Sequence, residues 1–420
     1  MFQFEKTSQL NMSDLQTNSL DHLVYKCPGL YGKDSKQIIL RKTFRQLLKE
    51  TNGRLIIPLF QRRYCWNKKT VSQWFDDVVR GQRDIHGTHN TGNVIVKRDS
   101  ENPEDFIIID GQQRITTTVI LLATLSKVAR RVLKIETADK LLKEAICELD
   151  QWIFLGPTRP ENESLVLGQD LKSSRLLPSF YDRRPLFQLL LNVQEGDDGK
   201  SHQLAAERVF MDKINREIEK NQHSRASELI YNLIRQSLDL MGVMLVEIVN
   251  DINMAQVFLW LQEKSLFGEA SLLYNPTPGV YFTAVDMARN LLLSPMMSES
   301  IADQERFYRQ NWLEPIESCF ATSAVFNLAL SEFIKLKCVD LTHESESEKA
   351  YVQYSNAATA SLSSQSRENI RTYAKLCSVL EQTSVKNCGP EQQRNGATSK
   401  EASIRFMQEF SKFSMNFTPI

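Results

Sequence analysis

The sequence lacks the features that would assign it to a secreted, disulfide-stapled or membrane-spanning class of protein. Its seven cysteines include no Cys-x-x-Cys pair, and their odd number argues against a disulfide framework. The N-terminal residues show no basic flank followed by an apolar core, so we expect no secretory leader. No apolar run approaches the roughly 18 residues that a membrane span needs. These absences predict an intracellular protein, cytoplasmic or nuclear, with no membrane partner.

The sequence also has no overall excess of positive or negative charge. The chain has 51 basic and 51 acidic residues, so its formal net charge is zero and predicts no global attraction to nucleic acid. A local excess remains between Arg54 and Arg83, where seven Lys and Arg are opposed by two Asp. Tyr64 and Trp66 lie within that stretch, and basic and aromatic side chains together suit a polyphosphate or a nucleic-acid backbone. DNA is therefore a candidate partner.

Metal-binding residues are few as well. Only six histidines are present, and the closest pair, His86 and His89, stands without the further ligands that a metal site needs. We therefore predict no metal held by protein ligands alone.

The most informative stretch that is present is Ile107–Thr118. Its three consecutive isoleucines predict a strand buried on both faces, and Gly111 permits the tight turn that follows. The sequence then continues to Arg131 without Gly or Pro, which predicts a long helix that begins at Gln112. Unpaired N–H groups and the positive end of the helix dipole meet at such a start, beside the phosphate-gripping guanidinium of Arg114. The pattern is typical of a phosphate cradle.

A purely structural alternative is open for the same residues. Asp110 followed three residues later by Gln113 fits a capping box, in which each side chain bonds the other's backbone N–H. The motif alone does not decide between a helix cap and a binding site. A second element favours the site, because Arg54–Trp66 joins an apolar strand and a proline to a dense polar-aromatic cluster.

Together the two blocks resemble the family named after the N-terminal domain of the GmrSD type IV restriction endonucleases. The hallmark of that family is an IPxFQRxYxW segment followed by DGQQRxTT, and both occur here, at residues 57–66 and 110–117. Weaker likeness continues in Gly92–Val96, Arg175–Leu190 and Val285–Leu293. The resemblance therefore covers roughly residues 36 to 335, most of the chain.

The resemblance implies a small α/β fold like that of ParB and sulfiredoxin, and the later hydrophobic patterns are almost wholly helical. We therefore predict an α+β protein in four parts. Residues 1–35 form a loosely ordered lead, 36–137 the ParB-like module with the DGQQR motif, and 138–340 a helical domain. Residues 341–420 form a polar tail, with a disordered linker over 385–402 and a short terminal helix.

Hydrophobic period places the individual elements. We predict strands at Leu55–Phe60, Val94–Val96, Phe106–Ile109 and, within the helical part, Met241–Val249. We predict helices from Ile38 to about Asn52, after a cap at Asn67 or Thr70, and at Leu141–Phe154, Leu186–Val193, Gln203–Glu219, Ala226–Met241, Met254–Leu266, Val285–Leu293 and Ile404–Phe413.

The chain departs from the family in two places. Many relatives carry a C-terminal nuclease domain of His-Asn-His type, and no such signature is visible here, because only His343 lies in the last third. An asparagine-glycine turn of the family is replaced by Gln262–Ser265 and an added stretch, which puts any role of that turn in doubt. Asp286, Arg289 and Asn290 of the family's DLxRN helix remain in place.

Two functions remain open. The first is a nucleotide-binding module that senses or hydrolyses a nucleoside triphosphate with Mg2+ in a modification-dependent defence system, with a separate nuclease chain as partner. The second is a non-catalytic module that keeps the fold and binds nucleic acid or another protein. The intact DGQQR motif favours the first, and the missing nuclease favours the second. Base preference, the DNA modification and oligomeric state are not predicted.

The site residues follow from the cradle and the resemblance. We assign catalytic roles to Asp110, Gln113 and Arg114, with Asp110 holding Mg2+ or orienting water. The nucleotide- and phosphate-binding set is Gln61, Arg62, Tyr64, Gly111, Gln112, Arg114 and Thr116. Support from the helical part is assigned to Asp286, Arg289 and Asn290.

Overall fold

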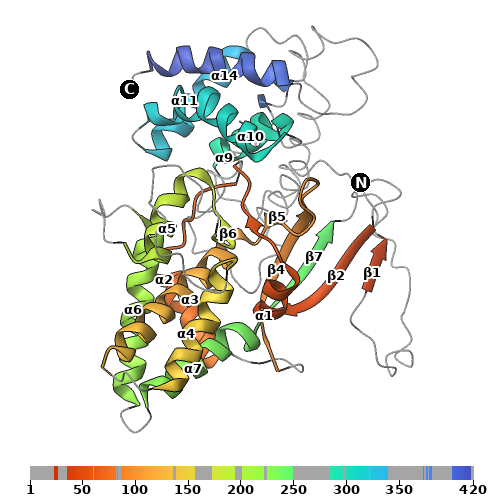
Figure 1. The fold of residues 1–420 in the computed structure, drawn as a ribbon. Coiled ribbons are helices and arrows are strands. Elements are labelled where there is room, and N and C mark those ends of the chain that lie inside the picture. The colour runs from red at the N-terminus through yellow and green to blue at the C-terminus, as the bar shows by residue number, and fades with distance from the viewer. Residues whose placement is uncertain are drawn as a thin grey trace, which may run out of the picture.

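A mixed β-sheet forms the centre of the protein, with helices on both of its faces (Figure 1). The computed structural model describes residues 23–26, 36–59, 61–81, 83, 87–135, 139–156, 173–193, 201–221, 225–248, 283–296, 299–320, 322–338, 372, 375, 376, 378–380 and 400–417. The α+β fold class predicted from the sequence is therefore confirmed.

The seven-stranded sheet has the order β1-β2-β7-β4-β5-β3-β6. Its strands are β1 Leu23–Lys26, β2 Lys36–Thr43, β3 Leu55–Ile56, β4 His89–Arg98, β5 Phe106–Asp110, β6 Leu176–Leu177 and β7 Met241–Ile248. β7 pairs antiparallel with β2, where Ile39 faces Val246, and parallel with β4, where Ile95 faces Val246. A strand from the segment predicted as the helical domain thus lies in the middle of the sheet.

The helices form two groups along the chain. The first group is α1 Phe44–Glu50, α2 Lys68–Arg80, α3 Gln112–Leu133, α4 Lys140–Ile153, α5 Arg183–Leu191, α6 His202–Lys220 and α7 Ala226–Arg235. The second group is α9 Ala284–Leu293, α10 Ile301–Tyr308, α11 Ser323–Cys338 and α14 Lys400–Ser414. In Figure 1 the first group lies below and to the left of the second, with the sheet beside both.

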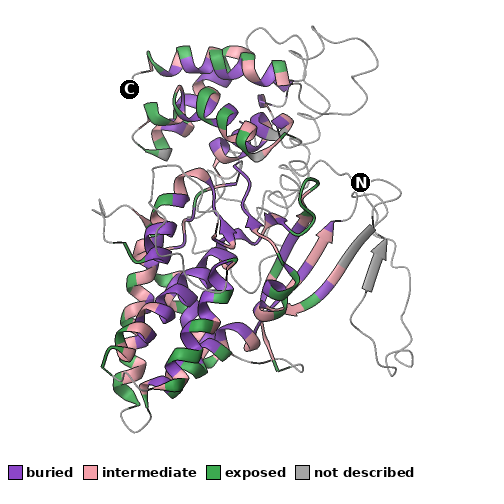
Figure 2. Ribbon diagram, in the orientation of Figure 1, coloured by how far each residue is buried: buried purple, intermediate pink, exposed green. Residues whose placement is uncertain are grey.

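Each group packs on its own face of the sheet. Val96 and Ile108 join the core that α1 to α7 enclose, whereas their chain neighbours Ile95 and Ile109 join the core of the C-terminal helices. This alternation is what the period of two in a strand requires. It confirms that the Ile107–Ile109 run is covered on both faces. Figure 2 shows that the buried residues gather in the strands and on the inner faces of the helices.

Several predicted elements changed in extent. The helix predicted from Ile38 is wrong over its first part, because Lys36–Thr43 is strand β2 and the helix begins only at Phe44. Thr43 caps α1 in a capping box with Gln46, so a local hydrogen-bond pattern fixes this start. The predicted strand Leu55–Phe60 is reduced to Leu55–Ile56.

Other predicted elements are confirmed. Asn67 caps α2, α3 begins at Gln112, and the strand predicted near Met241 is β7. The predicted helix Met254–Leu266 lies outside the described residues, as does most of the predicted linker over 385–402. Residues 400–402 of that linker form the first turn of α14. The lead 1–35 contains strand β1, an element that the sequence patterns did not indicate.

Helix α14 belongs to the C-terminal core. Phe406, Met407 and Phe410 are buried against α9 to α11, and the Phe410 ring lies near the rings of Phe326 and Phe333, with centroids 6.1 and 5.1 Å away. The short terminal helix that the sequence predicted is therefore a packed part of the fold.

Candidate functional site

The DGQQR motif forms the turn between β5 and α3. Gly111 is the N-cap residue of α3 and has φ of 92°, in the left-handed region that glycine adopts without strain. A Cβ at this position would lie 2.9 Å from Val94 Cγ2 and 3.1 Å from the carbonyl oxygen of Asn93. Both the backbone conformation and the close approach of β4 therefore require glycine.

The side chain of Gln113 bridges the two sequence motifs. Its Oε1 accepts a hydrogen bond from the Cys65 backbone N–H at 3.0 Å, and its Nε2 donates to the Arg63 carbonyl at 3.1 Å. No side chain caps α3, so the capping-box alternative of Asp110 with Gln113 is wrong. The Gln113 side chain therefore holds the backbone of residues 63–65 against the first turn of α3.

Gln61 makes a second contact between the motifs. Its side chain is 3% exposed, and Nε2 donates to the carbonyl of Ile109 at 2.6 Å and to that of Ile108 at 3.2 Å. These carbonyls lie at the end of β5, directly before the turn. The residue 61–66 segment is thus anchored to both sides of the turn at Gly111.

Tyr64 is part of the protein interior. Its hydroxyl lies 2.9 Å from Thr117 Oγ1 in α3, and burial raises the pKa of this phenol above its usual range. Its backbone N–H donates to Asp182 Oδ2 at 2.7 Å, an oxygen that also accepts from the Ser179 hydroxyl. Burial raises the pKa of Asp182, although these hydrogen bonds oppose the shift. Tyr64 therefore contributes to the site by fixing the loop.

Arg114 lies along the backbone of β4. Its Nη1 donates to the carbonyl of Asn93 at 3.1 Å, and a Cβ at Gly92 would lie 3.1 Å from Nη2. Gly92 has φ of 108°, a conformation that favours glycine, and the absence of a side chain leaves room for the Arg114 guanidinium. The Nε atom of Arg114 is buried and has no hydrogen-bond partner among the described residues.

The remaining predicted site residues are Asp110, Gln112, Thr116 and Arg62, which differ in burial and in their contacts. Within the described ranges, no hydrogen bond or ion pair engages the side chains of Asp110, Gln112 or Thr116. Gln112 is 5% and Thr116 3% exposed, and Asp110 is half-buried at the end of β5. Arg62 is half-buried, and its charge opposes the burial that raises the pKa of the Cys65 thiol.

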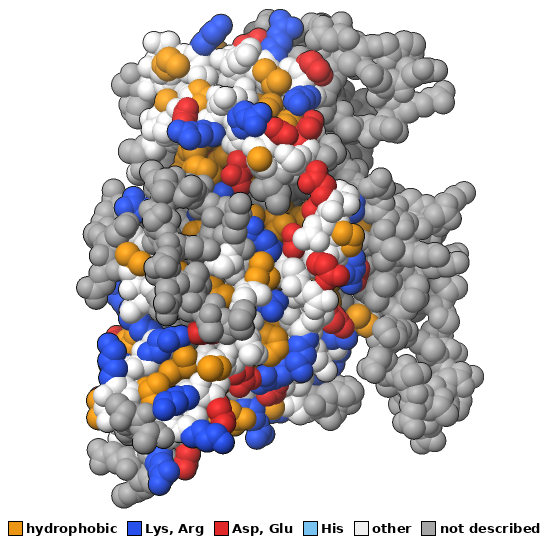
Figure 3. All heavy atoms as spheres, in the orientation of Figure 1, with side chains coloured by type: hydrophobic (Ala, Val, Ile, Leu, Met, Phe, Trp, Pro, Cys, Tyr) orange, Lys and Arg blue, Asp and Glu red, His pale blue; other side chains and the backbone are white. Residues whose placement is uncertain are grey.

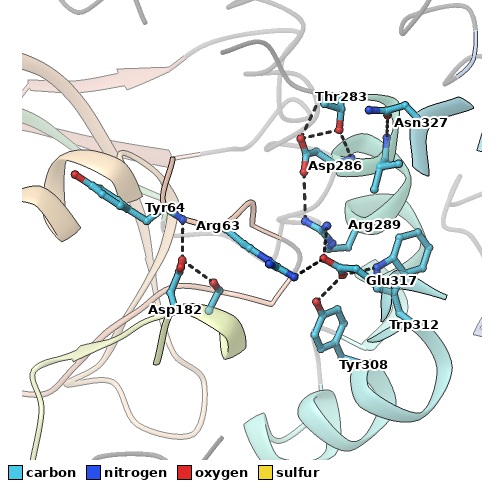
Figure 4. A network of polar contacts seen from close by, with 12 residues as sticks. Arg63, Tyr64, Asp182, Thr283, Asp286, Arg289, Tyr308, Trp312, Glu317 and Asn327 are labelled. Carbon is cyan, nitrogen blue, oxygen red and sulfur yellow. Dashed lines mark hydrogen bonds and ion pairs between the residues drawn. The ribbon is translucent and has the colours of Figure 1, made fainter. Parts of the chain in front are cut away.

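A polar network joins the residue 61–66 segment to the C-terminal helices (Figure 4). Arg63 forms an ion pair with Glu317 at 3.0 Å, and its guanidinium stacks 3.4 Å from the ring centroid of Tyr181. Glu317 also pairs with Arg289 at 3.2 Å and accepts from Tyr308 and Trp312. One carboxylate thus connects the residue 61–66 segment to helix α9 through two arginines.

Electrostatics in this network follow from its burial. Burial alone would raise the pKa of Glu317, but the charges of Arg289 and Arg63 hold it below its usual value. Burial would likewise lower the pKa of Arg289, and the Glu317 carboxylate raises it instead. Burial raises the pKa of Tyr181 to about 12. The Arg289 guanidinium and the Glu317 carboxylate therefore stay charged, and the Tyr181 phenol stays neutral, at neutral pH.

The predicted support residues lie on helix α9 of this network. Asp286 accepts from the backbone N–H and hydroxyl of Thr283 and pairs with Arg289 at 3.3 Å, so it caps α9 as well as holding the arginine. The Asp286 charge also raises the pKa of Cys65, which places α9 close to the residue 61–66 segment. Asn290 is fully buried in the same helix.

The sequence patterns missed several members of this arrangement. Arg63, Tyr181 and Asp182 lie in the two blocks that resemble the family but receive no role from the motifs, and nothing in the sequence marks Tyr308, Trp312 or Glu317. Asp182 lies within Arg175–Leu190, a block that resembles the family, so that block carries a usable signal. Glu317 shows no signal of its own, because the two arginines that pair with it lie 28 and 254 residues away in the sequence.

The described residues show neither a metal site nor a single membrane-spanning helix. No group of three or more His, Cys, Asp or Glu side chains in these ranges is placed to hold a metal ion. In the same part of the chain no single helix is long and apolar enough to cross a membrane, and one bent pair, Ala302–Cys319 with Ala324–Cys338, meets that test jointly by length and composition.

Fold and site together define an α+β module in which a glycine turn, a long helix start and a clamped arginine-rich loop converge. The chain matches the family model of the GmrSD restriction endonuclease, N-terminal domain, over residues 44–274, more than half of its length. It therefore belongs to this family, as the resemblance predicted. Helix α9, with Asp286, Arg289 and Asn290, lies beyond the matched residues. No curated protein matches the chain.

Proposed function

We propose that this protein is a nucleotide-binding module of a modification-dependent restriction system, with a nucleoside triphosphate at the start of α3. The observation that carries the proposal is the uncapped N-terminus of this 22-residue helix, which follows the positive-φ Gly111 directly. Free N–H groups and the helix dipole favour an anion at such a position. Residues 61–66, which include two arginines, are held against it by Gln61 and Gln113.

The residues present fit a triphosphate with Mg2+. Arg62 and Arg114 supply cationic donors, and Gln112 supplies a side-chain amide on the first turn of α3. Mg2+ in nucleotide sites is usually held by one or two carboxylates together with the phosphates, and Asp110 ends β5 beside the turn. Gln61, Gln113 and Tyr64 position the loop, and the buried Thr116 lies in the second turn of the same helix. Hydrolysis would also need a group that orients the attacking water, and we assign this role to Asp110.

Nucleotide binding is tested by thermal unfolding. Ligand linkage predicts stabilisation by about 2.7 kcal/mol when the free nucleotide is a hundredfold above its dissociation constant. We expect a rise in melting temperature with at least one of ATP, GTP, CTP and UTP at millimolar concentration with Mg2+. Arg62→Ala and Arg114→Ala should abolish this rise, and Arg98→Ala, an exposed arginine paired with Glu247, should preserve it. No shift with any of the four nucleotides would contradict the proposal.

A non-catalytic role is the second candidate, and one observation favours it. Gln61, Tyr64 and Gln113 make contacts that hold the fold together, so the motif would remain useful without catalysis. Such a module would bind nucleic acid or a partner protein. Phosphate-driven DNA binding weakens steeply with salt, so duplex binding that is insensitive to nucleotide and lost at high salt would favour this candidate.

A separate chain would supply DNA cleavage. We expect the purified protein alone to leave plasmid DNA intact with Mg2+, Mn2+ or Zn2+, whether or not the DNA is modified. Cleavage that appears only with a second protein and a nucleotide would support a sensor role. Cleavage by the chain alone that disappears in Arg62→Ala or Asp110→Ala would instead place a nuclease centre inside this module.

A further inference from the structure

A hollow of about 230 Å³ opens between α3, α4, α5 and α6, on residues that the proposed nucleotide site does not use. Its wall is apolar and includes Phe154, Leu189, Leu190 and Met211. Pockets for drug-sized ligands usually measure about 300 to 1,000 Å³. This hollow is smaller, and its size suits a single large apolar side chain.

One edge of the hollow is cationic. Lys127, Arg130, Arg131 and Lys134 follow one another along a stripe of α3 and all line it. Two of these charges are neutralised, because Lys127 pairs with Glu207 at 2.8 Å and Arg130 with the buried Asp150 at 2.5 Å.

The other two charges are left without a carboxylate. Arg131 donates to the neutral amide of Asn215 at 2.6 Å. Across the residues that the structure describes, Lys134 has no ion pair. The edge therefore presents two uncompensated positive charges. Figure 3 shows Lys and Arg side chains interleaved with apolar ones over the lower part of the molecule, where the α2 to α7 layer lies.

Three exposed apolar residues are chain neighbours of residues that line the hollow. Ile135 is 82%, Val193 41% and Leu155 38% exposed, and each directly follows a lining residue in the chain. Exposed apolar groups gathered around a hollow with a polar edge are the usual marks of a protein interaction site. A small anion would leave these side chains in water, whereas a protein segment would cover them.

We propose that this hollow is a docking site for an acidic segment of a partner protein that carries one large apolar side chain. The apolar side chain fills the hollow, and the flanking carboxylates face Arg131 and Lys134. A buried anchor supplies most of the affinity in such an interface, and the charges add specificity and speed of association.

The test uses labelled peptides and fluorescence polarisation. The probes are Glu-Asp-Trp-Glu-Asp, the same peptide with Gly in place of Trp, and Lys-Lys-Trp-Lys-Lys. We expect the first to bind at least about tenfold more tightly than the other two. Equal binding of all three peptides, or binding of none, would overturn the proposal.

Charge reversal gives the decisive variant. Arg131→Glu with Lys134→Glu should weaken the acidic peptide about tenfold and favour the basic one. Arg306→Glu with Lys335→Glu changes the net charge equally on exposed residues of α10 and α11 and should leave both affinities unchanged. Met211→Trp, which fills the hollow, should also weaken the acidic peptide, with circular dichroism confirming that each variant folds.

Three other outcomes would overturn the proposal. Cations at the end of a helix also stabilise its dipole, so loss of stability with unchanged peptide binding would assign Arg131 and Lys134 to α3 alone. Binding of 4-phenylbutyrate without binding of the acidic peptide would make the hollow a small-molecule site. Self-association that charge reversal abolishes, without peptide binding, would identify a second copy of this chain as the occupant.

Discussion

Gln113 holds the backbone of Cys65 with a side-chain amide that donates on one side and accepts on the other, across 48 residues of sequence. Because both the oxygen and the nitrogen of the amide are used, the first turn of α3 is tied to the arginine-bearing loop at two points. These two hydrogen bonds explain why a glutamine stands at this position.

The first prediction concerns this clamp. Gln113→Ala leaves the Cys65 N–H and the Arg63 carbonyl without partners, and an unsatisfied buried polar group costs about 1 to 3 kcal/mol. We expect the free energy of unfolding, measured in urea, to fall by about 2 kcal/mol. Gln73→Ala, which removes an exposed glutamine that bonds Asp77, should change it far less. Equal effects of the two variants would contradict the clamp.

The second prediction concerns Gly92 and Arg114. Gly92→Ala strains a positive-φ residue and forces the Arg114 guanidinium aside, so it should lower stability by about 1 kcal/mol and also abolish the nucleotide-induced rise in melting temperature. Gly87→Ala is the matched control, since Gly87 has φ of 75° but nothing within 4 Å of a Cβ. It should lower stability and keep the nucleotide response. If nucleotide raised the melting temperature of both variants equally, Arg114 would not take part in nucleotide binding.

The third prediction concerns Glu317. Glu317→Gln leaves the buried Arg289 with Asp286 as its remaining carboxylate partner, and removing one partner of a buried ion pair costs about 3 kcal/mol. Because the folded pKa of Glu317 lies below its usual value, this contribution is present at neutral pH and is lost as pH falls through the folded pKa. The stability difference between wild type and variant should therefore shrink below about pH 4. Glu332→Gln, in an exposed pair, should cost under about 1 kcal/mol.

The fourth prediction concerns Asp182, whose pH dependence has the opposite sign. Its folded pKa is raised, so the folded state binds the proton more tightly and stability falls as pH rises from about 4 towards that pKa. Asp182→Asn keeps an oxygen that accepts from Tyr64 and Ser179 and removes the buried charge. The variant should gain stability relative to wild type as pH increases, measured by urea unfolding at pH 4 and pH 8. A constant difference would show that Asp182 does not titrate in this way.

The fifth prediction concerns helix α14. Phe410 is fully buried among Phe326, Phe333 and Phe406, and Phe→Ala substitutions in cores cost about 3 to 5 kcal/mol. Phe410→Ala should therefore lower the melting temperature by several degrees. Met415→Ala, at a residue 70% exposed, should leave it nearly unchanged. A small effect of Phe410→Ala would mean that α14 is not required by the C-terminal core.

The sequence predicted those elements that depend on the backbone preferences of neighbouring residues. The isoleucine run, Gly111 and the uninterrupted helix after it fixed the β5–α3 turn because each residue constrains its own backbone. Ile38 and Ile39 were misassigned because their spacing to Phe44 fits a helical face, and only the pairing of β2 with β7 selects the strand. The contacts of Gln113 and Glu317 join distant segments, so no local pattern could reveal them.

The position of β7 has a consequence for how this protein is made. Ile39 and Ile95 both pair with Val246, so β2 and β4 belong to one sheet only because β7 lies between them, and β7 is synthesised long after both. Until β7 is made, one edge of β2 and one edge of β4 have unpaired backbone N–H and C=O groups, which can pair with another chain. A truncated protein that ends near residue 137 lacks β7, so these edges would stay unpaired. Soluble expression of the nucleotide site should therefore require the chain to continue at least through Ile248.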